Sequence, residues 1–182
     1  MRELKNCPLL MESSLREKSC KFFKSVILLL FMQKEGKFIV RKAKLSDVDG
    51  IYNLRLKTEE LEFSSEFPFH EKSELREFIL NPKENILLVA LINKKVVGFI
   101  YSKILSRRGD GWCMLDNIAV LKKYRDHGIG TRLLEETCKE LKKRKVYCVQ
   151  LLEELHHKKT RKFWKNRGFK EKKIFVWAEE MI

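Results

Sequence analysis

The 182-residue sequence predicts an α/β fold with a mixed, mostly antiparallel sheet of six to seven strands flanked by about four helices. Short apolar runs alternate with helical patterns along most of the chain. Three of these runs follow one another with only short polar turns between them, and a glycine-containing loop opens a long amphipathic pattern. The 44% hydrophobic content fits one folded domain with a sizeable core.

Residues 1–37 differ from the rest and predict an N-terminal arm or extension, followed by a domain that covers 38–182. Phe22 to Met32 is an apolar run interrupted by Lys24 and Ser25. A spanning helix needs roughly 20 apolar residues, about twice this length, and no small-residue cleavage site follows the run. The run therefore predicts packing on the domain or on a partner, or an extension before a start near Met32, rather than membrane contact.

A strand and two helices are expected first. The run FIVRKA at 38–43 favours a strand, and Ser46 or Asp47 can cap a helix that continues through Leu56. A second helix is expected over Ser73–Leu80, because the Asn-Pro pair that follows disfavours further helix.

Three antiparallel strands are expected next. Apolar runs cover 86–92 and 96–104, and the polar turn at 93–95 between them is typical of a hairpin. A second turn at 107–111 leads into a third apolar run over 112–120.

The C-terminal part predicts two further helices and two further strands. Apolar residues repeat at helical spacing from Ile129 to Leu141, and outward i,i+4 pairs are expected as Glu135–Lys139 and Glu140–Arg144. The remaining elements are a strand over Val146–Leu152, a helix over Lys158–Asn166 closed by Arg167-Gly168, and a last strand over Lys172–Met181.

The formal net charge of +14 is concentrated in one stretch, since Lys139 to Lys173 contains fourteen Lys or Arg against four Glu. Such a stretch can steer the phosphates of a cofactor, and a solvated surface explains most of its lysines equally well. It makes nucleic acid a weaker alternative as a partner. By contrast, Glu59 to Glu71 contains five Glu and no Lys or Arg, and we expect this acidic segment to lie mostly in a loop.

The cysteines and histidines predict no structural metal and a reducing, cytoplasmic location. The five cysteines show no paired short spacing and lie among apolar neighbours. The four histidines make no zinc-type pattern with them or with each other.

The segment Arg125-Asp126-His127-Gly128-Ile129-Gly130-Thr131 has the chemistry of an anion site. It follows a strand ending in Val120 and opens the long helix. Glycines let the backbone approach a phosphate, while first-turn amides and the helix dipole favour negative charge. A Gly-x-Gly before a helix also occurs as a simple tight turn, so the loop alone leaves both interpretations open.

Two motifs resemble those of the GNAT superfamily of acetyl-CoA-dependent N-acetyltransferases. Asn117-Ile118-Ala119-Val120, Tyr124 and the Arg125–Gly130 loop look like its acetyl-CoA signature, Arg/Gln-x-x-Gly-x-Gly/Ala. About forty residues on, Phe163-Trp164-Lys165-Asn166-Arg167-Gly168-Phe169 resembles its second motif, an aromatic pair followed by Gly-Phe. The resemblance covers about Phe38 to Met181 and implies the GNAT fold with acetyl-CoA as co-substrate.

The resemblance also implies where acetyl-CoA binds. The strand Met114–Val120 would separate from Val146–Leu152, with the pantetheine arm between them and the amide of Ile118 stabilising negative charge on the thioester oxygen. The implied cofactor-binding residues are Ile118, Ala119, Val120, Arg125, Asp126, His127, Gly128, Ile129, Gly130, Thr131, Phe163 and Trp164.

The sequence departs from the family in its proton-transfer residues. The family often has a tyrosine as general acid at the position of Trp164 and an asparagine at that of His157, and an indole N–H supplies no proton at useful pH. For the base, Asp116 is the first candidate, since polyamine-type members carry a carboxylate at the matching position. Glu153, which lies one place from a glutamate position of peptide-acetylating members, and His157, whose imidazole suits base chemistry, are rivals.

These features predict transfer of an acetyl group from acetyl-CoA directly to a primary amine of a small molecule or protein. Two alternatives remain: a non-catalytic acetyl-CoA-binding module, prompted by Trp164, and acetylation of a nucleic-acid-associated or ribosomal protein. The residues do not identify the acceptor, although the acidic segment would suit a cationic amine or basic peptide. The predicted last strand and the apolar arm are compatible with a homodimer.

Overall fold

A computed structural model describes residues 38–58, 71–107, 110–153 and 155–172. The chain divides into two compact units between Leu152 and Glu153, and each unit is described by itself. The predicted arm at 1–37 lies outside the described residues, as do the acidic segment before Glu71 and the predicted last strand beyond Lys172. None of the helices in the described ranges combines the length and apolar character needed to cross a bilayer.

The first unit is built on one sheet with the strand order β1-β2-β3-β4-β5. Its strands are β1 (Ile39–Lys42), β2 (Asn85–Ile92), β3 (Lys95–Arg107), β4 (Asp110–Val120) and β5 (Cys148–Gln150). Strands β1 to β4 pair antiparallel and β5 pairs parallel with β4, which confirms a mixed, mostly antiparallel sheet. Five strands lie within the described ranges, instead of the six to seven predicted. The sixth predicted run is the one that falls beyond Lys172.

The predicted hairpin forms as β2 and β3. Its turn residues Asn93 and Lys94 both have positive φ, 48° and 63°. Two consecutive left-handed residues produce a turn whose twist matches that of the flanking strands. Strand β2 is buried over nearly its whole length, which explains why its sequence is apolar without alternation.

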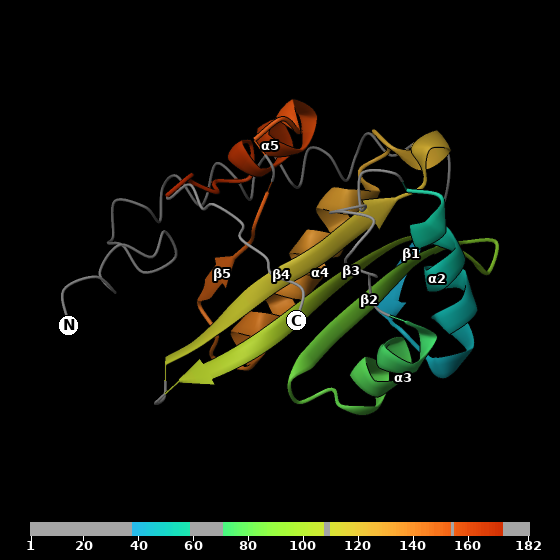
Figure 1. Cartoon of the computed structure of the whole chain (residues 1–182), viewed down its shortest axis with the longest axis horizontal. Coiled ribbons are helices and arrows are strands. Elements are labelled where there is room, and N and C mark those ends of the chain that lie inside the picture. Colours follow the sequence, from blue (N-terminus) through green and yellow to red (C-terminus); the bar gives the residue numbers. More distant parts are fainter. Residues whose placement is uncertain (1–37, 59–70, 108–109, 154, 173–182) are drawn as a thin grey trace, which may run out of the picture. The chain divides into compact units, whose positions relative to one another are not determined.

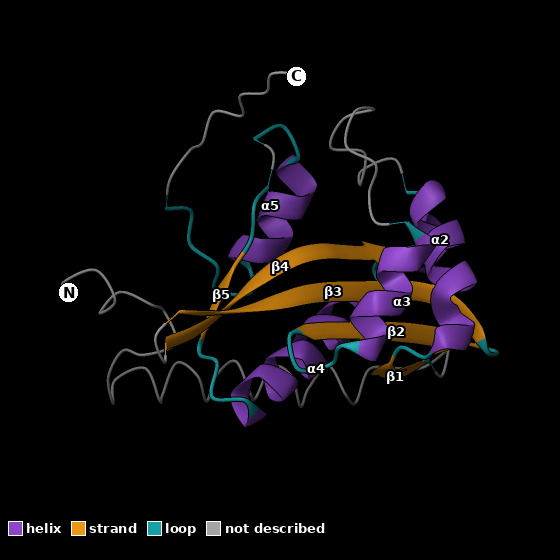
Figure 2. Cartoon of the chain, turned by 60° about the horizontal axis from the view of Figure 1, so that its bottom comes forward, coloured by secondary structure: helices purple, strands orange, loops and turns teal. Residues whose placement is uncertain are grey.

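Helices pack on both faces of this sheet. α2 (Val48–Leu56) and α3 (Lys72–Leu80) lie on one face and α4 (Ile129–Lys143) on the other (Figures 1 and 2). Phe78 of α3 stacks on Tyr101 of β3 with ring centroids 4.2 Å apart. On the opposite face, Gly98 allows α4 to come close, because a Cβ at this position would lie 3.2 Å from Cγ2 of Ile129. With α5 (Lys158–Lys165) of the second unit, the described residues contain the four α-helices predicted.

The start of α2 differs from the prediction. Residues Leu45–Asp47 form a short 3-10 helix, and Asp47 occupies the N-cap of α2 without a side-chain cap bond. Its carboxylate instead accepts the N–H of Lys44 at 2.7 Å and pairs with both Nη atoms of Arg41 at 2.6 and 2.9 Å. Burial would raise the pKa of Asp47, but these hydrogen bonds outweigh burial and lower it.

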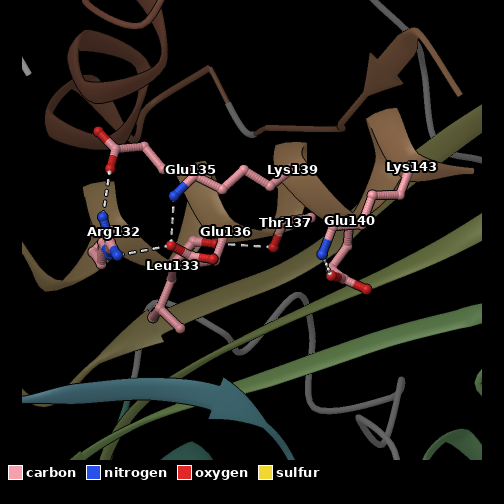
Figure 3. A network of polar contacts seen from close by, with 8 residues as sticks. All are labelled: Arg132, Leu133, Glu135, Glu136, Thr137, Lys139, Glu140 and Lys143. Atoms are coloured by element: carbon pink, nitrogen blue, oxygen red, sulfur yellow. Dashed lines mark hydrogen bonds and ion pairs between the residues drawn. The ribbon is translucent and has the colours of Figure 1, made fainter. Parts of the chain in front are cut away.

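The outer surface of α4 carries ion pairs other than those predicted (Figure 3). The pairs are Arg132–Glu135 at 3.8 Å, Arg132–Glu136 at 2.9 Å, Lys139–Glu136 at 2.8 Å and Lys143–Glu140 at 2.8 Å. The predicted pairs Glu135–Lys139 and Glu140–Arg144 are therefore wrong. Arg144 is the C-cap of the helix, so its side chain leaves the helical direction and donates to two carbonyl oxygens of the loop before β2.

Candidate functional site

The predicted phosphate loop connects β4 to α4, with a 3-10 turn over Lys122–Tyr124 at its start. Gly128 is the N-cap of α4 and has φ 77°, a left-handed conformation that favours glycine. The N–H of Arg132 bonds to the carbonyl of Gly128 at 2.9 Å, so helix geometry leaves the preceding first-turn amides for acceptors outside the helix. With the helix dipole, these amides make the loop suitable for a phosphate.

Two side chains of the loop hold its shape. Arg125 Nε donates to the carbonyl of Val120 at 3.0 Å, which ties the loop to the end of β4. The carbonyl of Arg125 lies 2.6 Å from Nδ1 of His127. Asp126 adds a second left-handed residue, with φ 65°. These contacts and backbone conformations define the shape of the loop.

Strands β4 and β5 separate, as the resemblance implies. Their parallel pairing covers only Trp112 to Met114, opposite Cys148 to Gln150. β4 continues to Val120, whereas β5 ends at Gln150. Beyond Met114, the edge of β4 away from β3 has no strand partner within the described ranges. The stretch that contains Ile118, Ala119 and Val120 thus presents backbone groups at an open edge.

Asp116 is the extra residue of a β-bulge in β4. Ser102 pairs with Leu115 and Tyr101 pairs with Asn117, so that no residue of β3 lies opposite Asp116. Asp116 is exposed, whereas Asn117 is buried. Cross-strand partners share a face, which puts Asn117 on the α2 and α3 side with Tyr101. Burial and then the charge of Asp116 raise the pKa of Tyr101, consistent with a carboxylate near this ring.

In the second unit, one hydrogen-bonded chain joins Glu153, His157 and Trp164. His157 Nδ1 lies 3.0 Å from Glu153 Oε1, and Trp164 Nε1 donates to Glu153 Oε2 at 3.0 Å. The sequence predicts Glu153 and His157 as separate candidates for the base, and the structure brings them into contact. Glu153 lies before α5, His157 is its N-cap and Trp164 is within it, so no regular repeat in the sequence indicates the group.

The Gly-Phe part of the second motif closes α5. Gly168 has φ 84°. Its N–H donates to the carbonyl of Lys165 at 3.1 Å, and the N–H of Phe169 donates to the carbonyl of Trp164 at 3.2 Å. The rings of Phe169 and Trp164 pack edge to face at 5.1 Å, and Phe163 packs against Trp164 at 4.9 Å. This is a Schellman motif with its hydrophobic contact, so the Gly-Phe pair has a structural role in this chain.

Comparison with known proteins decides the family. The family model described as Acetyltransferase (GNAT) family matches residues 49–169, which is more than half of the chain and includes both motifs. The chain belongs to the GNAT acetyltransferase family. The GNAT resemblance of the sequence is thereby confirmed.

This acetyltransferase is similar to two relatives that are each named N-alpha-acetyltransferase. It is 32% identical to the N-alpha-acetyltransferase of Sulfurisphaera tokodaii over 158 residues, covering 78% of this chain and 86% of the relative. It is 31% identical to the N-alpha-acetyltransferase of Saccharolobus solfataricus over 118 residues, covering 58% of this chain and 63% of the relative.

Solved structures confirm the GNAT fold. An aminoglycoside acetyltransferase from an uncultured soil metagenomic sample, in complex with trehalose, matches with a TM-score of 0.67 at 16% identity, covering 79% of this chain and 97% of that chain. The PaiA N-acetyltransferase of Thermoplasma acidophilum, in complex with coenzyme A, matches with a TM-score of 0.64 at 19% identity, covering 74% and 90%.

The GNAT acetyltransferase therefore transfers an acetyl group from acetyl-CoA to an amine. The left-handed Gly128, the first turn of α4 and the open edge of β4 fit a ligand with phosphates and an amide-containing arm. Within the described ranges, no three His, Cys, Asp or Glu side chains group as metal ligands.

Proposed function

We propose that this acetyltransferase acetylates the α-amino group at the N-terminus of a polypeptide. The observation that carries the proposal is the similarity to the N-alpha-acetyltransferase of Sulfurisphaera tokodaii, at 32% identity over 86% of that protein. The aminoglycoside acetyltransferase matches at only 16% identity, so it supports the fold and not the acceptor.

Backbone groups are proposed to hold most of the acetyl-CoA. The first turn of α4, from Gly128 to Thr131, supplies amides for the pyrophosphate. The open edge of β4 at Ile118, Ala119 and Val120 supplies groups for the pantetheine arm, and the amide of Ile118 would stabilise the thioester oxygen. Arg125, Asp126 and His127 shape the loop, and the resemblance adds Phe163 and Trp164 as contacts.

The proposed reaction is direct attack of the neutral amine on the thioester carbonyl. A C–N bond forms, the C–S bond breaks, and the amine loses one proton while the thiolate gains one. Asp116 is proposed as the base, because the bulge presents its carboxylate at an exposed position of β4. Burial raises the pKa of Cys113 to about 12 and also raises that of Cys138, which disfavours an acetyl-cysteine intermediate at these thiols.

The acceptor is tested with matched peptides and acetyl-CoA, with thiol release as the rate and mass spectrometry as the site assignment. Each peptide contains one internal lysine and is used with a free N-terminus or with a blocked one. We expect release only with the free N-terminus and an acetyl group on the α-nitrogen. Faster turnover with the blocked peptide, a polyamine or an aminoglycoside would contradict the proposed acceptor.

A further inference from the structure

An open cavity of about 630 Å³ lies where α4 ends beside the loop before β2. Its walls come from that loop, from β3 and the start of β4, and from the segment between α4 and β5. Sites for small molecules typically have volumes of roughly 300–1,000 Å³. The cavity is therefore large enough for a ligand that is more than a single ion.

The side chains that line this cavity make it positively charged. Three of them are basic, from Lys83, Arg144 and Lys145, and no acidic residue is among the described residues of the lining. The carboxylate of Glu84, which follows Lys83 in the chain, lies 3.5 Å from Nδ2 of Asn81. An anion in the cavity is therefore attracted by three cations at once.

The guanidinium of Arg144 is held in one orientation. Its Nη1 donates to the carbonyl oxygens of Pro82 at 2.6 Å and of Lys83 at 3.1 Å. Within the part of the chain that the structure describes, Nε and Nη2 have no hydrogen-bond acceptor. These two nitrogens form the edge of a guanidinium that binds a phosphate or carboxylate through two parallel hydrogen bonds. Because the group is already fixed, binding costs it little side-chain entropy.

The rest of the lining is mostly apolar. Pro82, Ile104 and Val146 contribute apolar side chains, and Val146 is buried. Gly111 adds bare backbone, which lies so close to Val146 that a Cβ at this position would be 3.1 Å from Cγ2 of the valine. A simple ion would leave this surface in contact with water. The lining therefore favours an anion that is attached to an apolar body.

The cavity is distant from the proposed acetyl-CoA site within the same unit. Gly128 and Arg144 are the caps at opposite ends of α4, whose 15 residues span about 22 Å. Gly111 lies near the start of β4, whereas the phosphate loop follows the end of this strand at Val120. A small ligand in the cavity is therefore expected to bind without displacing acetyl-CoA.

We propose that this cavity binds an organic phosphate monoester other than coenzyme A. The phosphate accepts hydrogen bonds from Nε and Nη2 of Arg144, and Lys83 and Lys145 add their charges. The apolar body lies against Ile104 and Val146. A phosphate monoester carries close to two negative charges at neutral pH, which match three cations better than the single charge of a carboxylate does. The site goes beyond the proposed function and does not depend on its acceptor.

The first test measures binding of phenyl phosphate to the full chain by calorimetry. We expect affinity about tenfold or more above that for inorganic phosphate, which has no apolar body, and above that for benzoate, which has one charge. Benzyl alcohol has no charge and should not bind measurably. Saturation with acetyl-CoA should leave the affinity for phenyl phosphate within about twofold. Displacement by acetyl-CoA, or no binding of phenyl phosphate, would overturn the proposal.

The second test assigns the binding to the side chains of the cavity. Arg144→Gln should weaken phenyl phosphate binding about tenfold or more, and Arg144→Lys, which keeps the charge but not the two-nitrogen edge, should weaken it less. Lys145→Asn should weaken it about threefold, and asparagine tolerates the φ of 59° at this position. Lys103→Gln is the matched control. Lys103 is exposed and precedes Ile104 on β3, where successive side chains point to opposite faces of the sheet.

The variants decide the proposal even if Arg144→Gln does not fold. Lys145→Asn changes an exposed side chain and leaves both carbonyl bonds of Arg144 in place. If Lys145→Asn and Arg144→Lys bind phenyl phosphate like the wild type, the cavity is not the site. A loss in Lys103→Gln as large as in Lys145→Asn would mean that only net charge matters, which also contradicts the proposal. Because binding is measured without an acceptor, failure of every peptide in the acetylation assay would contradict the proposed function alone.

Discussion

Glu140 of α4 and Lys42 of β1 form an ion pair in which Oε2 and Nζ are 2.9 Å apart. Lys143 binds the other carboxylate oxygen at 2.8 Å. Hydrogen bonds from Lys143 and Lys42 lower the pKa of Glu140 from 4.5 to about 2. The carboxylate therefore connects the helix that follows the phosphate loop to the edge strand of the sheet.

Glu140→Gln is expected to destabilise the protein at neutral pH by about 0.5–1 kcal/mol, a small effect because both lysines are largely exposed. A lowered pKa contributes stability that is present above the ordinary value of 4.5 and is lost as the pH falls towards about 2. Chemical denaturation of the wild type and of Glu140→Gln should show a difference in the free energy of unfolding at pH 7 that vanishes as the pH falls towards about 2. Glu77→Gln, at an exposed position of α3, is the control. An equal difference at both pH values would argue against the ion pair.

Gly128→Val is expected to weaken acetyl-CoA binding by tenfold or more. A β-branched residue at φ 77° carries about 1–3 kcal/mol of backbone strain, and its side chain also blocks the approach of a phosphate to the loop. Calorimetric titration with acetyl-CoA measures the effect. Gly128→Asn separates the two causes, because asparagine tolerates the left-handed conformation but still adds a side chain. Unaltered affinity in Gly128→Val would refute the role of the loop.

Asp116→Ala is expected to keep the affinity for acetyl-CoA and to lower turnover about 10²-fold, because the bulge carboxylate is proposed as the base. Asp116→Asn keeps the size of the side chain but removes its charge, and its turnover should fall by a similar factor. Asp49→Asn is the matched control and should keep the turnover of the wild type. Asp49 lies in α2, its side chain is 72% exposed, and its carboxylate pairs with Lys72 of α3. If all three variants turn over like the wild type, the base lies elsewhere.

The sequence was sufficient to predict elements that have a strong pattern of their own. The runs that became β2, β3 and β4 are apolar and bounded by turn residues, and α4 has a complete amphipathic repeat. The strand expected over Val146–Leu152 is shorter, with ladder pairing only at Cys148–Gln150. The length of this strand depends on where its pairing with β4 ends. That point is set by tertiary structure and has no local signal in the sequence.

The backbone conformation of the loop before α4 could be predicted, because a glycine directly before a helix is typical of a left-handed N-cap, as Gly128 is. That the loop binds phosphate stays a prediction. The arrangement at Asp116 could not be predicted, since a bulge arises from the register of β3 against β4 and not from either strand alone. The contact of Glu153 with His157 and Trp164 was missed for a related reason. Glu153 and His157 lie before the first residue of α5, where the chain has no regular repeat from which the contact of their side chains could be predicted.

Gly168→Ala tests the structural role of the second motif. No atom lies within 4 Å of the added Cβ, so the substitution acts only through the left-handed φ of 84°. We expect a local loss of about 1 kcal/mol, measured as faster hydrogen exchange at the amides of Gly168 and Phe169. Gly168→Asn should lose less, because asparagine visits this conformation more readily. If the amides exchange as slowly in both variants as in the wild type, the conformation of Gly168 does not control the end of α5. In that case the Gly-Phe pair would need a role other than capping.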